Sequence, residues 1–149
     1  MQGTPDGKIN ADNKVNRVEL AKILVEATWD DDHIAQASLS SNVYSDVEKG
    51  AWYLPYLELA RKKGFMGGDA QNANVTTTIR PGDFANGAEV AKMIAIAFDL
   101  DVRLGAEDEE WYEPYMGVLQ KKGAMPYSSP THLVTRGEMM FMISVVLKK

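Results

Sequence analysis

The sequence lacks cysteine altogether and has only two histidines, His33 and His132. The absence of cysteine excludes disulfides, thiolate metal ligands and cysteine nucleophiles, although it does not decide the redox compartment. Neither histidine has partners at the spacing that a zinc site or a catalytic triad requires. We therefore expect both histidines to lie in surface loops.

Long apolar runs are also missing. No stretch approaches the roughly 18 to 20 apolar residues that span a bilayer, and residues 1–7 lack the apolar core of a secretory signal. We expect no membrane insertion, and we expect any export signal to lie outside this chain. The length of 149 residues, with 45% apolar and 25% charged residues, instead predicts one compact domain over residues 1–149.

Basic residues are fewer than acidic ones: 16 Lys and Arg against 21 Asp and Glu give a net charge of -5. This charge disfavours long-range attraction to nucleic acid or to an anionic membrane, and we expect neither as a partner. An anionic ligand would need cations close to it, because screening decays over roughly 8 Å at physiological salt.

Two segments repeat one another at an offset of 59 residues. The residues Trp52–Tyr56 read WYLPY and the residues Trp111–Tyr115 read WYEPY, and each run leads to Lys-Lys-Gly, ending at Gly64 or Gly123. Proline is tolerated in a first helical turn, lysines suit the last turn, and glycine closes a helix in the left-handed conformation. Each segment therefore predicts a short helix, which we call a WY helix.

Three other segments have the pattern of an N-terminal capping box: Asn16–Glu19, Asn86–Glu89 and Thr135–Glu138. In such a box the first side chain accepts from a backbone N–H, and the glutamate reaches back to the cap. Apolar residues follow each box at helical spacing. They are Leu20, Ile23, Leu24 and Ala27, then Val90, Met93, Ile94 and Ala97, then Met139, Met142, Ile143 and Val146. We predict three equivalent, core-facing capped helices.

Eight residues before each of these glutamates stands Ala11, Pro81 or Pro130, which predicts an extended approach to the cap. Capped and WY helices thus alternate along the chain, beginning and ending with a capped helix. Loops rich in Asn, Asp, Gly and Thr separate them, at residues 38–50 and 67–84. The second is long enough to suggest a functional or extended surface loop.

This order of elements resembles the S-layer homology family, whose repeat runs from Asp-Val before a Trp-Tyr helix, through a glycine-rich loop, to a Thr-Arg-Ala-Glu helix. Here Asp46-Val47 precedes the first WY helix, Ile79-Arg80-Pro81 stands where the family has Phe-x-Pro, and Thr135–Glu138 reads TRGE. Pro5–Ile9, followed by the first capping box, is similar to the second half of a repeat.

The resemblance covers nearly the whole chain, as about two and a half repeats. Residues 1–29 correspond to the second half of a repeat, and residues 43–100 and 101–149 to full repeats. Three departures stand out: the first repeat lacks its WY helix, Gly87 replaces the signature arginine, and Glu107–Glu110 stands where Asp-Val would precede Trp111.

The resemblance implies a mainly α fold of short helices and long loops around a pseudo-threefold helical core. The capped helices would pack centrally and the WY helices would form outer arms. It also implies a non-catalytic, bacterial, secreted module at the cell surface. Such a module binds a cell-envelope (secondary cell wall) polysaccharide, often one that carries pyruvate ketals, in grooves between repeats.

The candidate arginines are Arg17 and Arg136, each just inside a helix start, where a cation faces the positive end of the helix dipole. This position favours an acidic partner, either a ligand or a structural carboxylate. A guanidinium pairs bidentately with a carboxylate, and the backbone donors of the helix N-terminus would serve the same anion. Arg80 is a further candidate for ligand contact.

Two aromatic residues and one acid complete the candidate site. Trp52 and Trp111 could stack on a sugar, although a repeated aromatic on a helical face more often belongs to the core, and we expect partial burial. Asp46 could accept from a sugar hydroxyl or orient an arginine, but an aspartate before a helix is commonly a turn former or cap.

We expect no cofactor, no metal and no catalysis. The run Asp30–His33 reads as a solvated charge run, because adjacent side chains diverge. Asp6-Gly7 and residues 10–13 resemble a calcium loop only vaguely, without its acidic spacing, which leaves calcium open. The acids Glu107–Glu110 give no sign of the separation that glycoside hydrolysis needs. Met139, Met140 and Met142 read as core filling.

An alternative remains open. The chain could be a structural or assembly module of a surface layer that keeps the fold but has lost glycan binding. Gly87 in place of arginine favours it. The incomplete first repeat would then leave an apolar groove through which two chains could associate.

Overall fold

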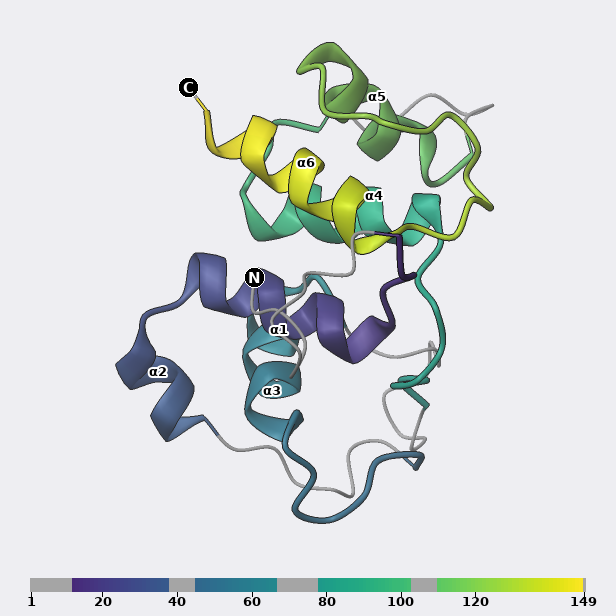
Figure 1. Ribbon diagram of the computed structural model, residues 1–149. Coiled ribbons are helices and arrows are strands. Elements are labelled where there is room, and N and C mark those ends of the chain that lie inside the picture. Colours follow the sequence, from purple (N-terminus) through teal and green to yellow (C-terminus); the bar gives the residue numbers. More distant parts are fainter. Residues whose placement is uncertain (1–11, 38–44, 67–77, 103–109, 149) are drawn as a thin grey trace. The chain divides into compact units, whose positions relative to one another are not determined.

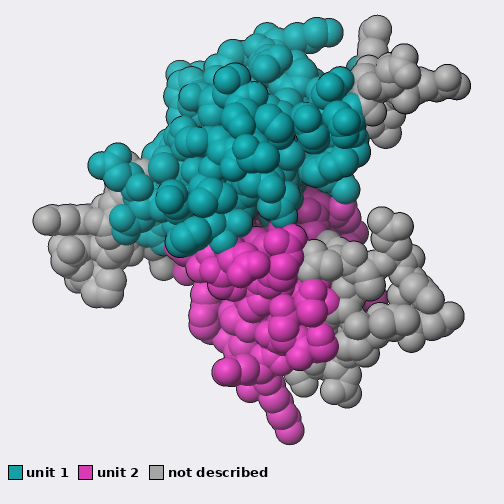
Figure 2. Space-filling view, turned by 90° about the vertical axis from the view of Figure 1, so that its right-hand side faces the viewer, with its two compact units in different colours: residues 1–15, 84–149 teal, residues 16–83 magenta. Residues whose placement is uncertain are grey.

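The computed structural model describes residues 12–37, 45–66, 78–102 and 110–148. These residues form six helices and no strand, so the predicted mainly α fold is confirmed (Figure 1). The chain divides into two compact units, coloured separately in Figure 2. Unit 1 comprises residues 1–15 and 84–149, and unit 2 comprises residues 16–83. This division does not decide whether residues 1–149 form one domain, so the single domain stays a prediction.

Unit 2 contains α1 (Arg17–Thr28), α2 (Asp31–Gln36) and α3 (Leu54–Lys63). The capped helix α1 packs against the WY helix α3, and α2 contacts both. Fully buried aliphatic side chains from α1 and α3 make this core. They include Leu20, Leu24, Val25 and Leu57.

Unit 1 contains α4 (Gly87–Ala97), α5 (Glu113–Lys121) and α6 (Arg136–Leu147). The capped helix α4 packs against the WY helix α5, which repeats the pairing seen in unit 2. All four apolar positions predicted for the core of α4 are buried, and so are Met139 and Met142 of α6. The prediction is wrong for Ala27 of α1, which is exposed because the buried face of α1 runs through Ala21 and Val25.

All three predicted capping boxes are present. The side chains of Asn16, Asn86 and Thr135 accept from the backbone N–H three residues later at 2.8, 2.9 and 3.1 Å. In return, the glutamate of each box accepts from the cap N–H at 2.9 to 3.3 Å. Each box satisfies two backbone donors and fixes the residue at which the helix begins.

The WY helices begin later than the sequence indicates. Helix α3 starts at Leu54 and α5 at Glu113, with proline in the first turn, so the Trp-Tyr pair precedes each helix. The predicted glycine ends are left-handed, with φ of +91° at Gly64 and +74° at Gly123. Two lysines close α3, whereas α5 ends at Lys121.

Within unit 1, three equivalent extended residues form a closed ring of backbone hydrogen bonds. Val15 N–H donates to Val134 O at 3.0 Å, Val134 N–H to Ala85 O at 3.1 Å, and Ala85 N–H to Val15 O at 3.1 Å. Each of the three stands immediately before the N-cap of a capped helix. The ring therefore gives these three residues the same bonding role.

The residues that lead to each capping box form what we call its approach segment. The first backbone N–H of each capped helix donates to the approach segment of another repeat. Arg17 N–H donates to Asp83 O at 3.0 Å within unit 2. Within unit 1, Gly87 N–H donates to His132 O at 2.7 Å, and Arg136 N–H to Asn13 O at 2.8 Å. These bonds satisfy donors that a helix start leaves open. We call each of these contacts a helix joint.

Candidate binding surface

Trp52 and Trp111 occupy equivalent places before α3 and α5, and both are largely exposed. Their exposed fractions are 57% and 53%, so neither belongs to the core, contrary to the usual role of a repeated aromatic. Each indole meets the following tyrosine edge-on, with centroids 5.5 and 5.6 Å apart and ring planes at 84° and 86°. The aromatic pairs thus have the same geometry in both units.

A lysine from the neighbouring capped helix lies over each indole. Lys22 Nζ is 5.8 Å from the ring centroid of Trp52, and Lys92 Nζ is 5.6 Å from that of Trp111. At this distance the ammonium interacts favourably with the ring face. Lys22 also lies 3.8 Å from Glu26 Oε1. We call each Lys, Trp and Tyr group a lysine–tryptophan platform.

The sequence prediction did not include these two lysines. The available signal was their equivalent position, since each stands three residues after the glutamate of a capping box. That position could be recognised only once the capped helix was known to pack against the WY helix. A platform offers a partly free indole face and an ammonium, which suit the apolar face of a sugar ring and a carboxylate.

The two candidate arginines have different surroundings. Arg17 is only 6% exposed, and its Nε donates to the carbonyl of Ile79 at 2.7 Å. Arg136 is half-buried. The expected supply of backbone donors for an anion is wrong at α1, because Asp83 O, Pro81 O and the Asn16 side chain accept from its first three N–H groups.

Asp46 binds the approach segment of unit 2 with both carboxylate oxygens. Its Oδ1 accepts from Ile79 N–H at 2.9 Å, and its Oδ2 accepts from Arg80 N–H at 2.8 Å. Arg80 is left-handed, with φ of +53°, and its Nη1 lies 3.7 Å from Asp83 Oδ2. Asp46 thereby holds a strained turn in place and fastens it to the loop that leads to α3.

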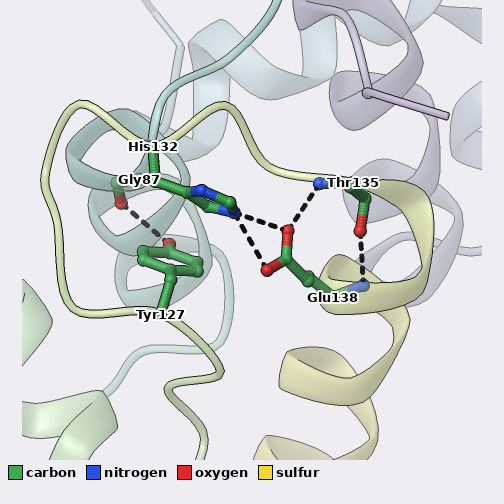
Figure 3. Close-up of polar contacts among 5 residues, drawn as sticks. All are labelled: Gly87, Tyr127, His132, Thr135 and Glu138. Atoms are coloured by element: carbon green, nitrogen blue, oxygen red, sulfur yellow. Dashed lines mark hydrogen bonds and ion pairs between the residues drawn. The ribbon is translucent and has the colours of Figure 1, made fainter. Parts of the chain in front are cut away.

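The third capping box carries a histidine in addition (Figure 3). His132 Nε2 lies 2.7 and 2.9 Å from the two carboxylate oxygens of Glu138, and Thr135 N–H donates to Oε1 at 2.9 Å. Burial alone would raise the pKa of Glu138. The bonds from Thr135 and the contact with His132 outweigh burial, so that its pKa is lowered. His132 lies in a loop, as expected, and its side chain is 36% exposed.

The other histidine, His33, lies in α2, so the expectation of a surface loop is wrong for it. Asp30 caps this helix by accepting from His33 N–H at 2.8 Å, and the same oxygen lies 2.6 Å from His33 Nδ1. The backbone hydrogen bond and this contact lower the pKa of Asp30. Among the described residues, no group of three or more His, Asp or Glu side chains could hold a metal ion. Asp6, Asn10 and the acids 107–109 lie outside those residues.

Residues 43–91 match the family model of the S-layer homology domain. The segment 43–91 is thereby identified as an S-layer homology domain. The match spans Asp46, the WY helix α3, the approach segment and the start of α4. No curated protein matches the chain. The family resemblance predicted from the sequence is confirmed for these residues.

S-layer homology domains are non-catalytic modules that anchor proteins to cell-wall polymers at the cell surface. The domain associates this chain with the cell surface. Of the helices described, none has the length and apolar character needed to cross a membrane.

Proposed function

We propose that the chain anchors its parent protein by binding an anionic secondary cell wall polysaccharide, such as one with pyruvate ketals, at the lysine–tryptophan platforms. The observation that carries this proposal is the duplication of the platform: an exposed indole, an edge-on tyrosine and a lysine recur with matching distances in unit 1 and unit 2. A large exposed aromatic side chain costs solvation free energy, which ligand stacking would recover.

Charge supports a short-range rather than a long-range mode of binding. The chain as a whole carries -5 and repels an anionic polymer at a distance. Lys22 and Lys92 supply cations beside the indole, where a sugar carboxylate would approach within the screening distance. Repeated weak contacts along a polymer would then add up through a high effective concentration.

The remaining candidates take different parts in the proposal. Half-buried Arg136 and the exposed Arg80 side chain supply further cations for the polymer. Arg17 and Asp46 act mainly by holding the approach segment, because their polar groups already bind the backbone of residues 79 and 80.

Co-sedimentation with envelope sacculi tests the proposal, with the secondary polysaccharide either retained or chemically removed. We expect the chain to sediment only with polysaccharide-bearing sacculi, and Trp52→Ala combined with Trp111→Ala to weaken binding at least tenfold. Phe141→Ala is the matched control, because Phe141 is a similarly exposed aromatic outside both platforms, at 45%. Full binding by the double tryptophan variant would overturn the assigned surface, and no binding by the unmodified chain to native sacculi would overturn the function.

A second candidate is assembly within a surface layer, favoured by the apolar surface of α6. Phe141 and Leu147 are 45% and 57% exposed there. Exposed apolar side chains grouped on one helix are a common mark of a protein interface. Assembly predicts a molar mass in light scattering that rises with concentration and falls back when Phe141 and Leu147 are both changed to serine. A constant monomer mass at high concentration would contradict it.

A further inference from the structure

Two of the helix joints can be compared residue by residue, one in each unit. In unit 2 the joint brings Arg17 against residues 78–83, and in unit 1 it brings Gly87 against residues 127–132. The backbone bonds are the same: the first helical N–H donates to Asp83 O or His132 O, and the second donates to the proline carbonyl two residues earlier, at 3.3 and 3.0 Å. The joints differ in the backbone before the proline, where Arg80 is left-handed and Ser129 is not, and in the side chains that fill them.

The side chains fill the two joints from opposite directions. In unit 2 the helix supplies the filler, because Arg17 is buried and its Nε donates to the Ile79 carbonyl. In unit 1 the approach segment supplies it, because Tyr127 lies over Gly87 and its hydroxyl donates to the Gly87 carbonyl at 2.9 Å (Figure 3). Tyr127 stands three residues before Pro130, and the residue at that place in unit 2 is the much smaller Thr78.

The space at Gly87 is fully taken. A Cβ atom added there would lie 2.5 Å from Tyr127 Cε2 and 2.7 Å from the Ser129 carbonyl oxygen. Both distances are shorter than van der Waals contact allows, so no side chain fits at position 87 while Tyr127 and Ser129 stay in place. Glycine at position 87 is therefore required by the Tyr127 ring and the Ser129 carbonyl together.

Tyr127 is also fixed on its other side. Its ring lies 5.1 Å from that of His132, at an interplanar angle of 32°, and His132 in turn contacts Glu138 of the third capping box. Burial, followed by the charge of Glu138, raises the pKa of Tyr127, so its hydroxyl stays neutral at physiological pH. The joint holds a neutral phenol where the joint of unit 2 holds a guanidinium.

We propose that Tyr127 is a built-in plug that closes the joint at Gly87 to anionic saccharides, so that this repeat can contact the polysaccharide through its lysine–tryptophan platform but not through this joint. This inference rests on the proposed function for its ligand, and on the geometry alone for the plug. Tyr127 thus controls whether this joint is open to a ligand.

The plug is tested first by a double-mutant cycle on stability, which needs no ligand. Gly87→Ala should lower the Tm by about 5 °C because the methyl group overlaps Tyr127 and Ser129. In a Tyr127→Thr background the same change should cost less, because only the overlap with the Ser129 carbonyl remains. Gly117→Ala is the matched control: a Cβ there meets nothing within 4 Å, and the Tm should rise by about 2 °C. Equal shifts from Gly87→Ala in the two backgrounds would overturn the plug.

The ligand part is tested with polysaccharide-bearing sacculi. Tyr127→Thr keeps Gly87 and removes the ring that closes the joint, and we expect it to raise the association constant at least threefold. Tyr127→Phe keeps the ring and should leave binding unchanged. If the unmodified chain binds and Tyr127→Thr binds no better, the selectivity role is wrong. If no variant binds, the proposed function fails. The stability cycle still tests whether Tyr127 fills the joint at Gly87.

Discussion

The two units use the same pair of helices in the same way, yet they differ at the joint. In each unit a capped helix packs on a WY helix and places a lysine over an exposed indole. At the joint, the filler is Arg17 from the helix in unit 2 and Tyr127 from the loop in unit 1. The comparison teaches that backbone bonding defines the repeat, whereas the side chain that fills the joint can come from either partner.

The largest effect is expected from removing the filler of unit 2. Arg17→Ala leaves the Ile79 carbonyl without this donor and opens a buried space, and should lower the free energy of unfolding by about 3 kcal/mol. Arg136→Ala, at a half-buried side chain, should cost less than half as much. Urea denaturation measures both, and equal losses would mean that the two arginines do not differ in role.

The carboxylate of Asp46 should have the next largest effect. Asp46→Ala removes two acceptors from backbone N–H groups and releases the left-handed turn at Arg80, which should cost about 2 kcal/mol. Asp46→Asn keeps one acceptor and should recover about half of that loss. Thermal unfolding followed by circular dichroism checks the order of the variants, and an asparagine variant no better than alanine would contradict the account.

A pH dependence should distinguish the third capping box. Because the pKa of Glu138 is lowered in the folded state, its ionised form stabilises the fold above its unfolded pKa, near 4.5. That contribution is lost as the pH falls from about 4.5 through the lowered folded value. Glu138→Gln should flatten the stability profile in this acid range, and His132→Ala should flatten it in part, since the bond from Thr135 remains. Urea midpoints measured from pH 3 to 7 test this, and unchanged acid profiles in both variants would refute it.

The smallest effects are expected at the platforms. Lys22→Gln and Lys92→Gln each remove an exposed cation–π contact, worth about 0.5 to 1 kcal/mol. In a Glu26→Gln background, which removes the ion pair of Lys22, the two losses should agree within error, since the platforms share their geometry. Chemical denaturation followed by tryptophan fluorescence measures them. A clear difference in that background would show that the platforms are not equivalent.

The sequence predicted the helices and their boundaries best where the signal was local. The capping boxes at residues 16, 86 and 135 involve residues three apart, and all three are present. The aromatic pairs misled the prediction of where the WY helices begin, because Trp52 and Trp111 stand before the first turn. Their expected partial burial agrees with exposed fractions of 57% and 53%.

The candidate site was harder to predict because its partners are distant in sequence. Lys22 meets an indole 30 residues further on, and Tyr127 meets a glycine 40 residues earlier. Gly87 was recognised as a departure, but no local pattern indicates that a tyrosine from another repeat fills the space. Such exchanges become visible only when two joints can be compared in three dimensions.

The ring of Val15, Ala85 and Val134 sets the timing of folding. Val15 must wait for a partner 119 residues downstream, so two of the three bonds form only after Val134 has left the ribosome. Until then, the Val15 N–H and the Ala85 carbonyl can form hydrogen bonds only with water. The helical pairs α1/α3 and α4/α5 need no such delay, because each is complete as soon as its own segment has been synthesised.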